Sequence, residues 1–162
     1  MTAFITFIVG AIGGFLIHSI SMKINFKQRT IDNKIKVYDS LISHWVRVRN
    51  YIYANFPKEP SENIPSNIII EFDQKYGESQ TWVAEAILLC EDKNLTDDIN
   101  ALNEKLYRTK WYTMTLEKAN VHMEEIKIEA FEIIRRMRED IKQGTILELS
   151  DFYHIFSGFK KR

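Results

Sequence analysis

The sequence contains few of the residues that interrupt helices or link chains covalently. It has one cysteine, Cys90, together with three prolines and six glycines among 162 residues. A single thiol excludes an internal disulfide, and neither glycine nor proline occurs between Gly77 and Gly144. No segment alternates polar and apolar residues over any length, as a half-buried strand would. These absences predict an all-α fold.

An excess of charge of one sign is also absent, since 22 basic residues stand against 22 acidic ones. A basic excess is the electrostatic signature of nucleic-acid binding, so the balance predicts that DNA is not a partner. The four histidines lie far apart, and no phosphate loop, nucleophile elbow or paired-cysteine motif occurs. His122 with Glu125 or Glu129 comes nearest to a metal-ligand set, but this spacing is typical of a solvated helix face. The sequence therefore predicts no metal, no cofactor and no enzymatic activity.

Charged residues are missing altogether before Lys23. Residues 2–22 read TAFITFIVGAIGGFLIHSISM, and about twenty mainly apolar residues are enough to cross a bilayer as a helix. We therefore predict a single transmembrane helix over residues 1–22, followed by a second domain over residues 23–162. A secretory signal peptide is the alternative, but it should carry a positive N-terminal region and a small-residue cleavage site. Only Ser19-Ile20-Ser21 approaches such a site.

The residues after the predicted span set its orientation. Cations next to a membrane helix tend to stay in the cytoplasm. We therefore expect a single-pass protein of the cell inner membrane, with its N-terminus outside and its C-terminal domain cytoplasmic. The same cations suit anionic lipid headgroups, which makes membrane lipid an expected partner. The run consists of Lys23, Lys27, Arg29, Lys34 and Lys36.

Small and polar residues gather on one side of the predicted span when it is drawn as a helix. Gly10 and Gly14 form a GxxxG pair next to Gly13, a pattern that lets two membrane helices approach closely. The chain shows no second span, so the partner helix would come from another copy, and we expect a homo-oligomer. The alternative is that glycines are simply common in membrane helices.

Three polar residues of the same side could line or gate a pore within a ring of copies. They are Thr6, His18 and Ser21. His18 titrates near neutral pH, although snorkelling to the interface beside Lys23 would explain it equally well. Nothing on this side resembles a selectivity filter.

The cytosolic part is predicted to be a helical bundle whose first helix continues from the span. Its apolar stripe consists of Ile31, Ile35, Tyr38, Ile42, Trp45, Arg49, Ile52 and Phe56, and the helix should end at Pro57. A short helix would run from Ser66 to Gly77 and a strongly buried one over residues 79–91.

A helix start is predicted at Thr96-Asp97-Asp98. Residues 97–142 then form either one long helix or two helices broken near residues 118–122. Ser150 could cap a short aromatic and basic helix within residues 149–162, and this helix could pack on the bundle or dock on a partner or membrane.

Arg49 is out of place in an apolar stripe, because a buried charge needs a partner. It could pair with Glu85 or Glu104, snorkel to solvent, or form a polar site with Asn50 and Asn55. The segment Arg49-Asn50-x-x-x-x-Asn55 resembles a degenerate Arg-Asn-x-x-x-x-His motif of the HEPN helical domains, many of which are RNases. Asparagine cannot titrate, so the resemblance implies no general acid–base catalysis at this position.

A HEPN-like bundle behind an N-terminal span is similar to the family of small membrane accessory proteins of type VI-B CRISPR systems. This resemblance implies an oligomeric membrane pore or effector that supports antiphage defence. A different hypothesis is a membrane-tethered scaffold or adaptor that recruits a cytosolic protein or an RNA–protein partner. A membrane-bound RNase that uses Arg49 is the third.

Overall fold

The described part of the chain is entirely helical. The computed structural model describes residues 2–56, 59–60 and 64–145, except that nothing is described of the side chains of residues 2–13, 15 and 16. Within these limits the chain forms four α-helices and one short 3₁₀ helix, and no strand. The prediction of an all-α fold is confirmed. The helices are α1 (Thr2–Asn55), α2 (Ser66–Leu89), α3 (Lys93–Arg108) and α4 (Leu116–Thr145), with the 3₁₀ helix at Trp111–Thr113.

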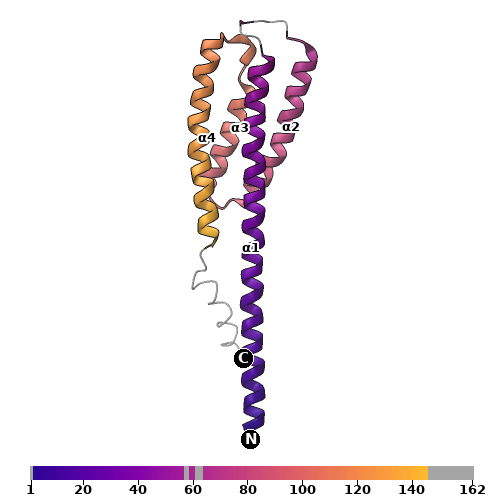
Figure 1. The fold of residues 1–162 in the computed structure, drawn as a ribbon, viewed down its shortest axis with the longest axis vertical. Coiled ribbons are helices and arrows are strands. Elements are labelled where there is room, and N and C mark those ends of the chain that lie inside the picture. The colour runs from indigo at the N-terminus through magenta and orange to yellow at the C-terminus, as the bar shows by residue number, and fades with distance from the viewer. Residues whose placement is uncertain (1, 57–58, 61–63, 146–162) are drawn as a thin grey trace. The chain divides into compact units, whose positions relative to one another are not determined.

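The chain divides into two compact units. One comprises Met1–Asp32 with Lys142–Arg162, and the other comprises Asn33–Ile141. The second unit is a four-helix bundle, in which α2, α3 and α4 lie alongside the C-terminal part of α1 (Figure 1). The bundle holds the groove and the polar clusters described below.

Helix α1 runs without interruption through the end of the predicted span, as the sequence indicated. Its backbone is helical from Thr2 to Asn55. The helix ends where the sequence places Pro57, because a proline disfavours helical geometry in the residue before it. The continuation of the first helix from residues 1–22 into the bundle is therefore confirmed at the level of the backbone.

The membrane crossing itself is not supported by the structure. In the stretches that the structure describes, no helix combines the length and the apolar character needed to cross a bilayer. Most side chains of the predicted span, those of residues 1–13, 15 and 16, lie outside the described residues. The transmembrane assignment of residues 1–22 stays a prediction.

The buried face of α1 differs from the predicted stripe. Ile35 is exposed and Arg49 is only half-buried, so both predictions of a core position were wrong. The predicted stripe also left out polar residues that lie on the buried side of the helix, and buried apolar residues between its members. The residues buried from α1 are Ile31, Lys34, Val37, Tyr38, Leu41, His44, Trp45, Val48 and Ile52.

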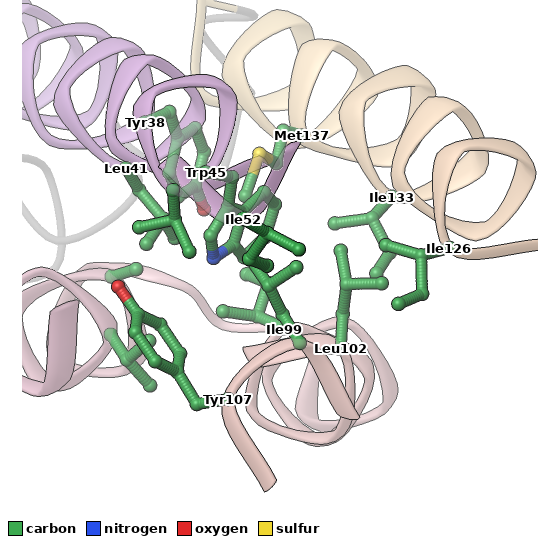
Figure 2. Close-up of a cluster of buried hydrophobic side chains, with 14 of the residues drawn as sticks. Tyr38, Leu41, Trp45, Ile52, Ile99, Leu102, Tyr107, Ile126, Ile133 and Met137 are labelled. Carbon is green, nitrogen blue, oxygen red and sulfur yellow. The ribbon is translucent and has the colours of Figure 1, made fainter. Parts of the chain in front are cut away.

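The core forms where α3 and α4 face this side of α1. Figure 2 shows Tyr38, Leu41, Trp45 and Ile52 of α1 gathered in one cluster with side chains of α3 and α4. The labelled contributions from α3 are Ile99, Leu102 and Tyr107, and those from α4 are Ile126, Ile133 and Met137.

Aromatic side chains join α2 to this core. The ring centroid of Phe72 in α2 lies 5.1 Å from that of Tyr107. It lies 5.3 Å from the ring centroid of Phe56, which it contacts edge-on. Such pairs add to the free energy gained from burial alone.

Helix α2 does not end at Gly77. The whole helix has 24 residues and runs from Ser66 to Leu89, so the prediction of a short helix closed by Gly77 was wrong. A glycine inside a helix costs about 1 kcal/mol relative to alanine. Phe72 before Gly77, and Val83 and Ala86 after it, are buried. The packing of these side chains outweighs that cost.

The part of α2 after Gly77 is also less buried than the sequence indicated. Val83 and Ala86 face the core, but Ile87 is exposed and Leu88 is 84% exposed. Trp82, Leu89 and Cys90 are half-buried. The apolar run predicted a strongly buried helix over residues 79–91, whereas the bundle covers only one side of it.

The last two helices begin earlier and break earlier than predicted. Asp92 is the N-cap of α3, because its side chain accepts hydrogen bonds from the amides of Asn94 and Leu95. The break before α4 spans residues 109–115, rather than 118–122. Trp111 causes it, since its buried ring donates from Nε1 to the carbonyl of Leu106 at 2.8 Å. The predicted helix at residues 149–162, with Ser150 as its cap, lies outside the described residues.

Leu41 and Leu88 provide a matched test of this core. Leu41 is fully buried and Leu88 is almost fully exposed. We expect Leu41→Ala to lower the free energy of unfolding by about 2–5 kcal/mol, and Leu88→Ala to change it by less than about 0.5 kcal/mol. Urea unfolding of the full chain, followed by tryptophan fluorescence, measures both. Equal losses in the two variants would contradict the described packing of α1.

Candidate functional site

The predicted span residues are described only in part. The side chain of Thr6 and the surroundings of Gly10 and Gly13 lie outside the described residues. Gly14, His18 and Ser21 are exposed, and a Cβ atom added at Gly14 would meet no heavy atom within 4 Å. Their predicted roles in span packing and pore lining therefore stay predictions.

The degenerate HEPN-like motif is not assembled into one site. The Arg49 guanidinium donates to Oδ1 of Asn50 at 3.2 and 3.4 Å. Asn55 instead donates to the backbone carbonyl of Tyr51 at 3.0 Å. Six residues of α-helix turn the chain by about 600°, which leaves Arg49 and Asn55 about 120° apart around the axis. The spacing itself separates the two side chains.

The predicted carboxylate partners of Arg49 were also wrong. Glu104 accepts from Tyr76 at 2.5 Å and from Gln80 at 3.1 Å, and it pairs with Arg108. Glu85 is exposed. Arg49 needs no buried partner, because its side chain lies at the edge of the bundle where solvent reaches it.

Arg49 borders an apolar groove between α1 and α4, which we call the α1–α4 groove. Its volume is about 120 Å³. Leu102 and Leu106 of α3 lie among its lining residues, and the only charged ones are Arg49 and Lys127. The others are Ile42, Trp45 and Val46 of α1, and Met123, Ile126, Ala130, Phe131 and Ile134 of α4.

The chemistry of the groove lining defines what kind of occupant would fit it. Its lining is apolar apart from two groups, Arg49 and Lys127, that are both cationic. An occupant would have to be apolar at its centre and acidic at its edge.

A second cluster joins α1 to α4 through a buried ion pair. The Lys34 ammonium lies 3.0 and 3.2 Å from the two carboxylate oxygens of Asp140. Tyr38 donates to Oδ2 of Asp140 at 2.8 Å, and all three residues are buried. Burial is the main cause that raises the pKa of Tyr38, and hydrogen bonding to Cys90 and Asp140 adds to it.

Lys34 was predicted as one of the cations beside the membrane, and the structure corrects this. Its side chain is buried in the bundle against Asp140. The signal was present in the sequence, because Lys34 follows Ile31 by three residues and precedes Tyr38 by four. This spacing places it on the buried side of the helix. A lysine there needs an anion, and the sequence alone did not show that Asp140 supplies it.

A third cluster surrounds the buried imidazole of His44. Its Nε2 lies 2.7 Å from the hydroxyl of Tyr107 and 3.0 Å from the carbonyl oxygen of Lys75. Tyr107 also donates to that carbonyl at 2.9 Å. With the proton on Nε2, Nδ1 becomes a buried acceptor to which the structure assigns no donor. The imidazole is inaccessible to a substrate, so this cluster orders the bundle.

His122 and its neighbours do not form a metal site. Its Nδ1 lies 3.2 Å from Glu125 and its Nε2 lies 3.2 Å from the hydroxyl of Thr109. Glu129 instead accepts from Lys105 at 2.5 Å. Across the described residues, no group of three or more potential ligands is placed to hold a metal ion.

Comparisons with protein-family models, curated proteins and solved structures find no match to this chain.

The buried ion pair yields a stability prediction. Asp140→Asn leaves the Lys34 charge buried without an anion, which should lower the free energy of unfolding by about 3–5 kcal/mol. Replacing both residues by apolar ones, Lys34→Met with Asp140→Leu, should recover most of that loss. Urea unfolding of each variant measures the effect, and Arg135→Met serves as the control for an exposed pair. An Asp140→Asn variant as stable as the wild type would contradict the presence of a buried ion pair.

The His44 cluster predicts how stability depends on pH. Burial is the main cause that lowers the pKa of His44 below its ordinary value of 6.5. Arg47 and Lys75 also lower this pKa, while the Lys75 carbonyl and Glu78 oppose the shift. Below pH 6.5 the unfolded chain therefore takes up a proton before the folded chain does.

The contribution of neutral His44 to the free energy of unfolding is therefore complete above pH 6.5. It declines as the pH falls toward the lowered pKa. The slope should reach at most about 1.4 kcal/mol per pH unit. His44→Gln should remove this component between pH 6.5 and 5.5, whereas His122→Gln should keep it. Thermal unfolding across this range measures the difference, and an unchanged slope in His44→Gln would refute the assignment.

Proposed function

We propose that this chain is a single-pass inner-membrane protein that assembles into a homo-oligomer, with residues 23–162 in the cytoplasm. The observation that carries the proposal is the uncharged run of residues 2–22. It lies in the same uninterrupted helix that contributes the buried face of the bundle.

Exposed apolar side chains in the N-terminal unit support membrane attachment. Ile17, Met22, Ile24 and Phe26 are all exposed. Isolated exposed apolar residues are common in soluble proteins, but here four fall within ten residues of one helix. Ile17 and Ile24 lie on one side of it, and Met22 and Phe26 lie on the opposite side. The basic residues that accompany Ile24 and Phe26, beginning with Lys23, are typical of the interface between lipid and cytoplasm.

Self-assembly would use the small residues of the same segment. Gly10, Gly13 and Gly14 would let two helices approach closely in lipid, where packing replaces the hydrophobic effect as the driving force. Identical contacts between copies close most readily into a cyclic ring. In such a ring Thr6, His18 and Ser21 would face the interior.

The resemblance to HEPN-like membrane accessory proteins supplies the specific form of the proposal. A ring of this kind would act as a membrane pore or effector that supports antiphage defence. Asn55 replaces the histidine of the motif, and it lies apart from Arg49 around the helix axis. We therefore propose that the protein acts through its assembly and not through RNA cleavage.

Two glycines give a matched test of the proposal. Gly14 and Gly77 both lie within helices, and a Cβ atom at either would meet nothing within 4 Å in the single chain. We expect the detergent-solubilised wild type to have a mass that is a multiple of 19.1 kDa. Gly14→Leu should lower it toward one copy, whereas Gly77→Leu should leave it unchanged. Light scattering measures the masses, and a monomeric wild type would end the proposal.

A further inference from the structure

We infer that the α1–α4 groove receives helix α4 of a second copy of this chain. In this contact Ile128 of one copy enters the groove of the next, while Glu124 and Glu132 beside it meet Arg49 and Lys127. The inference rests on the proposed self-assembly and adds a cytoplasmic contact to the one in the membrane.

The size of the groove favours one inserted side chain. An engineered apolar cavity of about 150 Å³ binds one benzene molecule, and the groove measures about 120 Å³. This space suits a single aliphatic side chain such as that of isoleucine. A large apolar side chain seated in a desolvated pocket is typical of the residues that dominate interface energies.

The charge of the groove specifies what surrounds that side chain. Its two charged lining residues are Arg49 and Lys127, and both are cations. An occupant that places carboxylates next to its apolar anchor would complement them. The planar guanidinium of Arg49 suits a carboxylate especially well, because it can donate two parallel hydrogen bonds.

Helix α4 itself carries this combination on its outer side. Ile128 is 68% exposed. Glu124 and Glu132 are exposed as well, and they precede and follow Ile128 by four residues. Residues four apart lie on the same face of a helix. An apolar anchor with a carboxylate one turn away on each side therefore matches a groove with two cations.

The present partners of these charges are easily exchanged. Lys127 lies 2.9 and 3.1 Å from the carboxylate of Glu124, and Glu132 pairs with Arg135 at 2.5 Å. Both pairs join exposed residues three positions apart, and exposed ion pairs contribute little to stability. Arg49 donates to the neutral amide oxygen of Asn50. Docking would replace these contacts with pairs between copies.

The two surfaces are adjacent on α4. Lys127 and Phe131 line the groove together with Met123, Ile126 and Ala130, whereas Ile128 is exposed and is not among the lining residues. One copy therefore presents both surfaces. Such a contact is head-to-tail, and head-to-tail contacts form a ring when the rotation between copies closes. The inferred contact is therefore compatible with the ring proposed for the membrane segment.

A disulfide-trapping experiment tests the contact in the full chain. Cys90 is first replaced by serine, and two tagged copies, one with Ile128→Cys and one with Val46→Cys, are expressed together in membranes. Val46 lines the groove, and a disulfide forms only where the two Cβ atoms come within about 4.5 Å. Oxidation by air with a copper catalyst should link the copies covalently. The control pair, Leu88→Cys with Val46→Cys, should not become linked.

A charge exchange provides the second measurement. One chain carries Glu124→Lys and Glu132→Lys, and the other carries Arg49→Glu and Lys127→Glu. Each chain also carries both Ile128→Cys and Val46→Cys. The disulfide product should be lost when either chain is expressed alone, because like charges then meet. It should return when the two chains are mixed.

The possible failures separate this contact from the proposed membrane assembly. A wild type that is oligomeric in detergent but yields no Ile128–Val46 product overturns the inference and leaves the membrane assembly intact. A product that is insensitive to both charge reversals also overturns it, as does equal linking of the Leu88 control. Linking that persists in Gly14→Leu while the detergent mass falls would support the contact independently of the span.

Discussion

The packing of α2, α3 and α4 against one face of α1 is the constraint on which the rest of the structure depends. Leu41 and Val48 are fully buried on that face, with Tyr38 and Trp45 beside them. The same helix extends without a break to Thr2. A change in the register of α1 against the bundle would move Lys34 away from Asp140 and His44 away from Tyr107. The buried polar groups thus fix the position of α1, because an unpaired buried charge is far more costly than an imperfect apolar contact.

The sequence predicted the helical class and the continuity of the first helix because both depend on local patterns. It placed boundaries less well. Gly77 was read as an end, although packing on both sides carries α2 through it. Asp92 was missed as an N-cap because three later polar residues also resembled one. The partners of Lys34, His44 and Asp140 could not be read from the sequence, because each lies more than thirty residues away. The groove was equally invisible, since three helices build it, although Arg49 was recognised as unusual.

The polar clusters and the α1–α4 groove differ in their surroundings. The polar clusters are buried and connect helices, whereas the α1–α4 groove is apolar and bordered by two cations. For Arg49 the sequence left open an ion pair, a side chain that snorkels to solvent, or a polar site, and its half-buried position at the edge of the groove fits the second of these. The outer side of α4 carries Ile128 between two carboxylates, so a single chain displays both halves of a complementary contact.

The most direct test of the central claim is fractionation of cells that express the full, untagged chain. Membranes are washed with alkaline carbonate, which releases peripheral proteins, and are then extracted with detergent. Residues 2–22 contain no charge, and a helix of that composition in the bilayer resists the carbonate wash. The chain should therefore remain with the membranes after the wash and enter solution only with detergent. Recovery of the intact chain in the supernatant before detergent is added would contradict the claim.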